Sequence, residues 1–159
     1  MLIFYVSFII IKQDTRYFVK SVNPYLNFNG QTEEAFNFYK SLFGGEFLQV
    51  MRFNNIPGNE NISENAKEKI MHIALKICYN VILMGTDAIE SMGQNLKVGN
   101  NMHISIEAES KEEADKLFYA LSDGGVIDNP TQDLFWGDYF GNLSDKFGIG
   151  CMISFSNQT

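Results

Sequence analysis

Residues 32–45, TEEAFNFYKSLFGG, set out a pattern that returns at residues 110–125 as SKEEADKLFYALSDGG. Both segments begin with acidic residues, which favour a helix N-terminus, continue with apolar residues at helical spacing and end in a pair of glycines. Glu33 corresponds to Glu112, an offset of 79 residues, and the glycine pairs are offset by one residue more. Two such segments in register rarely arise by chance, so they predict an internal duplication.

Strand patterns surround both predicted helices, so that each copy has one strand before its helix and three after it. Thr32 and Ser110 are predicted helix N-caps, and Glu113 completes a capping box with Ser110. The sequence therefore predicts an α+β fold of two βαβββ modules, at about 22–87 and 101–155. The predicted strands are 22–28, 47–53, 70–77 and 80–84 in the first module, and 102–108, 126–127, 134–140 and 150–155 in the second.

The composition limits the class of protein. A chain of 159 residues with 45% hydrophobic residues can bury one core, which favours a single domain. The formal net charge of −7 argues against nucleic acid or a membrane surface as a partner, because either would require a basic patch. Cys78 and Cys151 have neither metal-ligand nor disulfide spacing, so we expect a cytoplasmic protein.

The N-terminal residues stand apart from the duplicated unit. Residues 1–11 form an apolar run that is too short for a membrane span, which needs about 20 residues. The duplicated pattern begins near Val22, so we treat 1–20 as a leader and 21–159 as a single domain. Three interpretations of the leader stay open: an added edge strand, an arm that docks on a partner subunit, or a start codon placed too far upstream.

Spaced motifs cover almost the whole of the predicted domain. They are NPYLNF at 23–28, EA at 34–35, FGG at 43–45, MHIAL at 71–75, FWGDYFG at 135–141 and DKFG at 145–148. Together they resemble the PhnB-like proteins of the vicinal-oxygen-chelate superfamily, which includes glyoxalases, bleomycin-resistance proteins and dioxygenases. The resemblance implies mixed sheets that curl around a concave cavity, usually in a homodimer. Lys146 departs from the pattern, because the family usually has proline there, and Cys151 stands where an aromatic residue is common.

The resemblance also lets the sequence be tested for a metal site. Metal-dependent members of the superfamily take four ligands, His or Glu, from the first and last strands of each module. The duplication puts these positions near Pro24, Leu83, His103 and Met152. Only His103 offers a side chain that a divalent ion accepts, so we predict no metal. A methyltransferase label is common in the family, but the sequence contains no glycine-rich cofactor-binding fingerprint, so we predict no cofactor either.

Alternation along two predicted strands places both histidines opposite apolar neighbours. His72 alternates with apolar residues in 70–77, and His103 and Ser105 do so in 102–108. If the apolar sets pack under the helices, both histidines look into the cavity, where they would contact a ligand or act as a general base near neutral pH. The alternative is a hydrogen-bonded strand histidine with no role beyond packing.

Aromatic residues near the C-terminus form a second candidate for ligand contact. Trp136 and Tyr139, flanked by Phe135 and Phe140, belong either to the core or to a ligand site, and neighbouring glycines would allow a ligand to approach closely. The asparagine-rich segment 53–65 is predicted to form either a mobile loop over the site or an ordinary linker.

Three functions remain open at this level. A small-molecule binding protein with a metal-free cavity is favoured, because no nucleophile, base and orienting residue can be assigned together. The second is a metal-independent enzyme that uses His103 or His72 as a base. The third is a structural or regulatory dimer whose cavity has no ligand. The sequence identifies neither the ligand nor a substrate.

The leader gives a first testable prediction. Deleting residues 1–20 should leave folding intact, because the duplicated unit is complete without them. Thermal unfolding of the deleted and full-length chains measures this. A drop in the thermal midpoint of more than about 5 °C, which is on the order of 1 kcal/mol for a domain of this size, would show that the leader packs into the fold.

Overall fold

The computed structural model describes residues 19–55, 57, 62–78 and 81–156, so almost all of the predicted leader lies outside the described residues. Within the described part, the chain forms two four-stranded mixed sheets, one in each module. In each sheet the first strand of the module pairs in parallel with the last, and the other neighbouring strands are antiparallel. The predicted α+β fold class with two βαβββ modules is confirmed.

The elements of the two modules follow the predicted order. The first module contains β1 (Tyr25–Phe28), α1 (Thr32–Phe43), β2 (Glu46–Arg52), β3 (Ile70–Cys78) and β4 (Val81–Asp87), in the sheet order β1-β4-β3-β2, with η1 (Phe53–Asn55) and α2 (Glu64–Lys67) between β2 and β3. The second contains β5 (His103–Glu107), α3 (Lys111–Ser122), β6 (Val126–Asp133), β7 (Tyr139–Ser144) and β8 (Gly150–Phe155), in the order β5-β8-β7-β6, with η2 (Glu90–Met92) in the connector before it.

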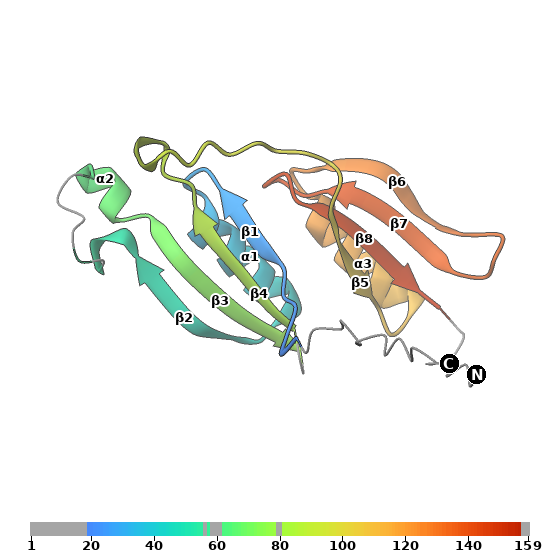
Figure 1. Cartoon of the computed structure of the whole chain (residues 1–159). Coiled ribbons are helices and arrows are strands. Elements are labelled where there is room, and N and C mark those ends of the chain that lie inside the picture. Colours follow the sequence, from blue (N-terminus) through green and yellow to red (C-terminus); the bar gives the residue numbers. More distant parts are fainter. Residues whose placement is uncertain (1–18, 56, 58–61, 79–80, 157–159) are drawn as a thin grey trace, which may run out of the picture.

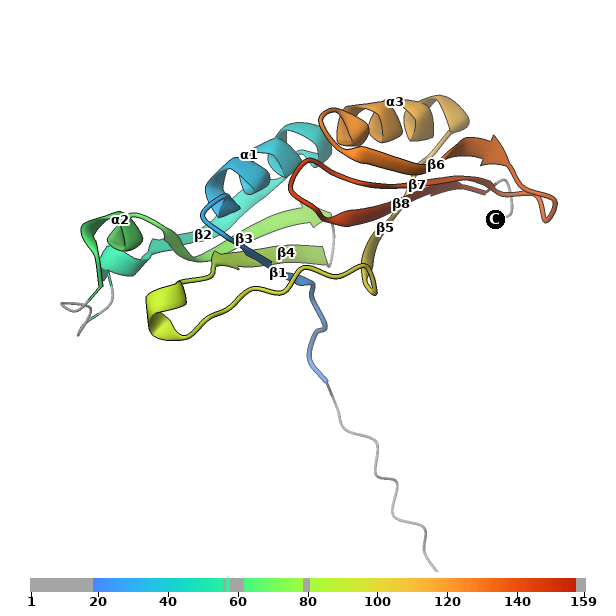
Figure 2. The same cartoon turned by 90° about the horizontal axis from the view of Figure 1, so that it is seen from above.

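The two long helices cover the same side of the sheets (Figure 1). Seen from above, α1 and α3 lie on one side of the two sheets, and the connector 88–102 crosses on the other side (Figure 2). Phe36 of α1 is buried in one core cluster with Leu75 of β3, and Phe118 of α3 is buried in the other with Ile153 of β8. The opposite faces of both sheets, which we call the open face, are not covered by either of these helices or by any other long helix among the described residues. None of the helices in the described residues is long and apolar enough to span a membrane.

The start of α1 differs from the prediction. Thr32 is the first residue of the helix rather than its cap, and Gln31 at the cap position makes no side-chain hydrogen bond. The capping carboxylate comes instead from Asp87 at the end of β4, which accepts hydrogen bonds from the Thr32 N–H (3.1 Å) and hydroxyl (2.6 Å) and from the Gly30 N–H (2.9 Å). It also accepts the N–H of Ile70 at 2.8 Å. A partner 55 residues away cannot be identified from local sequence.

The start of α3 agrees with the prediction. The Ser110 hydroxyl accepts a hydrogen bond from the Glu113 N–H at 3.1 Å. The Glu113 carboxylate reaches back to the N–H of Glu109 at 2.7 Å, one residue before the expected partner of a capping box. The two helices of the duplication therefore begin through different contacts, one long-range and one local.

The strands of the second module need one correction. Residues 134–140 were predicted as a strand, but β6 runs on through Asp133 and a tight turn follows. The Leu134 N–H bonds to the Asp138 carbonyl, and Gly137 adopts a φ of 104°, which favours glycine. The apolar residues 134–136 before this glycine indicated a strand. In the structure the strand lies earlier in the chain, because β6 pairs with β7 through polar residues up to Asp133. In the first module, β1 begins at Tyr25 rather than at residue 22.

The modules are joined where the turn between β7 and β8 enters the core of the first module. Phe147 in this turn makes edge-on or near-edge contacts with the rings of Phe28, Phe38 and Tyr39, at centroid distances of 6.3, 5.7 and 6.1 Å. The turn residue Lys146 lies 4.8 Å from the centroid of the Phe38 ring, so a side chain that proline could not provide also contributes to the junction.

A buried hydrogen bond fixes this turn. The Tyr39 hydroxyl on α1 donates to Asp145 Oδ2 at 2.7 Å, while Asp145 Oδ1 accepts the N–H groups of Phe147 and Ile149 at 2.9 Å each. Both partners are buried, at 1% and 3% exposure. Burial, together with the charge of Asp145, raises the pKa of Tyr39 far above its ordinary value, so the phenol stays protonated and remains a donor.

Removing this donor should destabilise the chain. We predict that Tyr39→Phe lowers the free energy of unfolding by about 1.5–3 kcal/mol, because a buried carboxylate loses a charge-assisted hydrogen bond. Urea unfolding measures the loss. Tyr119→Phe is the matched control, because the Tyr119 side chain is 64% exposed. Equal unfolding midpoints for the two variants would contradict the role given to the bond.

Candidate functional site

A cleft of about 270 Å³ lies between the two modules. Its walls come from β1, from the start of β5, from the exposed connector and from the turn that joins the modules. The lining is mainly apolar, so we call this the apolar lobe. It is formed by residues 25–29, Gln31, residues 96–99, residues 102–104 and residues 147–150.

A second hollow of about 310 Å³ adjoins the first on the face of the second sheet. We call it the polar lobe, because polar side chains from β6 and β7 stand in it. It is lined by Gly99, Asn100, His103, Asp128, Asn142, Ser144, Gly148 and Gly150. Four of these residues, Gly99, His103, Gly148 and Gly150, also line the apolar lobe, so the two lobes are continuous.

His103 stands at the contact of the two lobes. It is the first residue of β5 and pairs with Gly150 of β8. A Cβ atom placed on Gly150 would lie 2.6 Å from His103 Cδ2, so the imidazole rests directly on a backbone that lacks a side chain. Within the described residues, no hydrogen-bond partner occupies its ring nitrogens. They are therefore available to a ligand.

His72 lies outside both lobes but contacts a residue of the cleft. Its Nδ1 is 3.1 Å from the hydroxyl oxygen of Tyr25, and the two rings stack at a centroid distance of 5.7 Å. Tyr25 lines the apolar lobe. Burial raises the pKa of Tyr25, partly offset by a hydrogen bond with Thr86, so the phenol is protonated at neutral pH. The structure thus connects His72 to the cleft through one side chain rather than placing it in the cleft.

Ser105 is exposed on the open face, two residues along β5 from His103, and pairs with Met152 of β8. It lines neither lobe. Ser105 and His103 share one face of β5, as predicted from strand alternation. The residue between them, Ile104, packs against the core of the first module.

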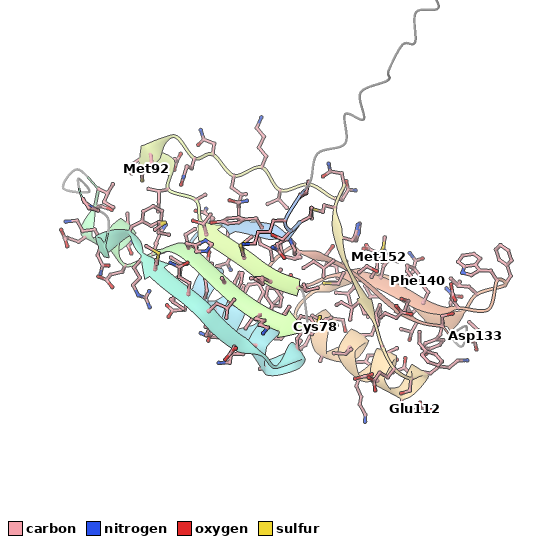
Figure 3. The ribbon with its side chains drawn as sticks, turned by 60° about the horizontal axis from the view of Figure 1, so that its bottom comes forward. Cys78, Met92, Glu112, Asp133, Phe140 and Met152 are labelled. Atoms are coloured by element: carbon pink, nitrogen blue, oxygen red, sulfur yellow. The ribbon has the colours of Figure 1, made fainter. Side chains whose placement is uncertain are left out.

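The aromatic candidates lie at the far end of the second sheet. Phe135 is 97% exposed and Trp136 is 54% exposed at the tip of the hairpin between β6 and β7, and the indole N–H donates to Asp138 at 2.9 Å. This hairpin extends beyond the sheet (Figure 2), and Figure 3 labels Asp133 and Phe140 near its base. Neither aromatic residue lines the cleft in the single chain.

Tyr139 points the other way, toward α3. Its hydroxyl donates to Asp115 Oδ1 at 2.7 Å, and its ring packs against the core of the second module. The structure therefore does not bring Tyr139 or Trp136 together with His103.

The described parts of the segment predicted to form a loop over the site lie elsewhere. Phe53 is buried in a small cluster with Ala66 and Ile89, and α2 sits at the end of the first sheet that is remote from the second module (Figure 1). Residues 56 and 58–61 lie outside the described residues. The cleft is instead bordered by the later connector, through Leu96 and Val98. The sequence feature that could have indicated this border is the pair of apolar residues, Leu96 and Val98, in a segment that is otherwise polar.

The positions proposed for metal ligands need a correction of register. Leu83 is 1% exposed and packs under α1, so it faces away from the open face. The pleat puts its neighbours Ile82 and Met84 on the open side, and a shift of one residue exchanges the two faces. Neither neighbour is a ligand for a hard divalent ion. Among the described residues, no three His, Cys, Asp or Glu side chains gather closely enough to hold a metal ion.

The cysteines offer no nucleophile in the cleft. Both are free, Cys78 exposed and Cys151 buried. Burial, reinforced by the charge of Asp145, raises the pKa of Cys151 to about 12, so its thiol stays protonated at neutral pH. The chemistry available in the cleft is therefore hydrogen bonding and proton transfer at His103, beside an apolar surface.

Paired βαβββ modules with both helices on one face define the fold of the glyoxalase/bleomycin resistance/dioxygenase, or vicinal-oxygen-chelate, superfamily. A family enzyme of this kind from Burkholderia phytofirmans has the same fold at 18% identity, with a TM-score of 0.56 over 82% of this chain and 95% of its own. The sequence model of the family described as 3-demethylubiquinone-9 3-methyltransferase matches residues 20–154. The chain belongs to this family, and its fold is that of the superfamily.

Three relatives are similar over almost their whole length. Protein YjdN of Escherichia coli is 27% identical over 141 residues, which are 86% of this chain and 96% of the relative. The crystal structure of protein PA1353 from Pseudomonas aeruginosa is 32% identical with a TM-score of 0.76, over 86% of this chain and 97% of its own. A PhnB protein from Bacillus cereus is 26% identical with a TM-score of 0.70, over 85% and 98%.

The contact between His103 and Gly150 gives a prediction. Gly150→Ala should lower the free energy of unfolding by about 1–3 kcal/mol, because the new methyl group would overlap the imidazole. In a His103→Ala background the same change should cost little, since the ring that it displaces is gone. A double-mutant cycle in urea measures this difference. Additive losses would mean that the ring does not rest on Gly150.

Proposed function

We propose that the chain binds a small molecule in the cleft between its modules, without a metal ion, as a homodimer in the cytoplasm. The observation that carries the proposal is the position of His103, whose imidazole has no hydrogen-bond partner among the described residues and stands where an apolar lobe meets a polar one. Ligand sites are typically apolar hollows with a few convergent polar groups that fix orientation. The cleft has this composition.

A metal-free site is supported by the side chains that are present. A catalytic divalent ion needs about three good ligands, and His103 is the one candidate at the positions that metal-dependent relatives use. The neighbouring polar residues of the cleft add one carboxylate, Asp128, and otherwise amides and a hydroxyl. This donor set does not fit a glyoxalase-type metal centre.

Methyl transfer, which the family description names, finds no support in the residues. The sequence contains no glycine-rich cofactor-binding fingerprint. A metal-independent enzyme is the second candidate, because the free nitrogens of His103 could abstract a proton from a bound ligand. His72 suits this role less well, since its Nδ1 is already in contact with the Tyr25 hydroxyl.

A homodimer is supported by the apolar surface that the single chain leaves exposed. Tyr25, Leu48 and Val81 in the first module are 42%, 51% and 41% exposed. Val126 and Ile127 on the outer strand of the second sheet are 63% and 45% exposed. A second copy would cover apolar surface and an exposed strand edge that a monomer has to protect in other ways.

Native mass spectrometry of the chain purified from its own host tests binding and assembly together. We predict a complex of about twice 18.1 kDa that carries the additional mass of a small organic molecule. Val98→Trp, which fills the apolar lobe, should lose the added mass, while Val22→Trp, the same change at a position that is 88% exposed and outside the cleft, should keep it. A bare monomer would contradict both parts, and a ligand that survives Val98→Trp would place the site elsewhere.

Elemental analysis after dialysis tests the metal-free site. We predict less than about 0.1 equivalent of nickel, zinc, iron, manganese or copper, and no change in that value for His103→Ala, because one imidazole cannot hold a divalent ion. Calorimetric titration with each ion extends the measurement. About one equivalent of tightly held metal that disappears in His103→Ala would overturn the proposal.

A further inference from the structure

We infer that the ligand of this cleft is an amphipathic amine, with its protonated amino group in the polar lobe and its apolar body in the apolar lobe. The inference rests on the proposed binding function and names the chemical class of the ligand. Three features of the cleft support it: the carboxylate of Asp128 in the polar lobe, the hydrogen-bond acceptors around that carboxylate, and the positive charge of Lys97 at the opposite end.

The backbone of β6 brings Asp128 to the polar lobe. Ile127 pairs with Leu143 of β7, and Asn129 pairs with Asn142, so Asp128 has no residue opposite to it. Such a bulge adds one residue to a strand and changes the direction of a side chain, and bulges are frequent beside binding sites. Because of the bulge, the consecutive polar residues Asp128 and Asn129 can both lie on the open face of the second sheet.

The carboxylate of Asp128 is uncompensated among the described residues. Neither lysine nor arginine lines the polar lobe, and no described cation forms an ion pair with Asp128. An anionic head group would therefore meet a like charge, and acidic residues outnumber basic ones throughout residues 101–156. A protonated amine would instead form a charge-assisted hydrogen bond.

Neighbouring groups can accept hydrogen bonds from the remaining N–H groups of an ammonium ion. The Ser144 hydroxyl lines the same lobe, and the unpaired ring of His103 offers a nitrogen acceptor when it is neutral. The carbonyl oxygen of the Asn142 side chain is already bonded to Asn129 at 2.7 Å but retains a second lone pair. An ammonium has three donors and no acceptor, which matches this set.

The apolar lobe sets the orientation of the ligand. Leu96, Val98 and Met102 give it an apolar wall, whereas Lys97 on the exposed connector adds a positive charge at its rim. Lys97 disfavours an ammonium at that end, and Asp128 favours it at the other. The two charges therefore select one direction for an amphipathic cation. Asp128 is exposed to solvent, so screening limits its effect to about a fivefold change in affinity.

Titration of the isotope-labelled full-length chain, followed by amide chemical shifts, tests the inference. Three probes of similar shape are used: 2-phenylethylamine as the cation, 2-phenylethanol as the neutral compound and 3-phenylpropionate as the anion. Asp128→Asn removes the carboxylate. Asp123→Asn is the matched control, because it makes the same change in net charge within the same module but at an exposed position outside the cleft.

The expected result is that the amine binds most tightly, with shifts around Asp128, His103 and Gly150. Asp128→Asn should weaken this binding about fivefold, and Asp123→Asn should leave it unchanged. If the alcohol or the carboxylate binds at the same residues as well as the amine does, or if Asp128→Asn has no effect, the amine inference is overturned and the binding function stands. If no probe shifts the residues of the cleft, both are overturned.

Discussion

The hydrogen bond from the Tyr39 hydroxyl to the buried Asp145 carboxylate holds the two modules in one arrangement, and the cleft depends on it. Asp145 also accepts the N–H groups of Phe147 and Ile149, so one side chain orders the turn and attaches it to α1. The same turn supplies Phe147, and the residues directly after it, as the inner wall of the cleft. The contact that joins the modules therefore also shapes the site between them.

The duplication has diverged at the places where the two modules meet and where the ligand is proposed to bind. Tyr39 and Phe118 occupy equivalent positions, 79 residues apart, and both are buried. The hydroxyl of Tyr39 is used for the junction, whereas Phe118 fills its own core. On the open face, the first module presents Tyr25 stacked with His72, and the second presents His103 beside Asp128. The cleft is thus asymmetric although the fold is repeated.

Much of the fold could be predicted from the sequence, because helical spacing and strand alternation are local properties. The alternation around His103 puts it opposite Ile104, and in the structure Ile104 packs against the core of the first module. The position taken from the duplication was wrong at Leu83, where an error of one residue reversed the face. Contacts such as that of Asp87 with Thr32, 55 residues apart, left no local signal. The bulge at Asp128 was equally hidden, because it depends on pairing with β7.

The central claim is that the junction of the modules is a binding site rather than packed space. A crystal structure of the chain purified from its own host tests it most directly. We expect continuous density for a non-protein molecule over His103, between the connector at Val98 and the backbone at Gly150. A cleft that contains only ordered water, with ligand density beside the Phe135 and Trp136 hairpin or at His72 instead, would contradict it.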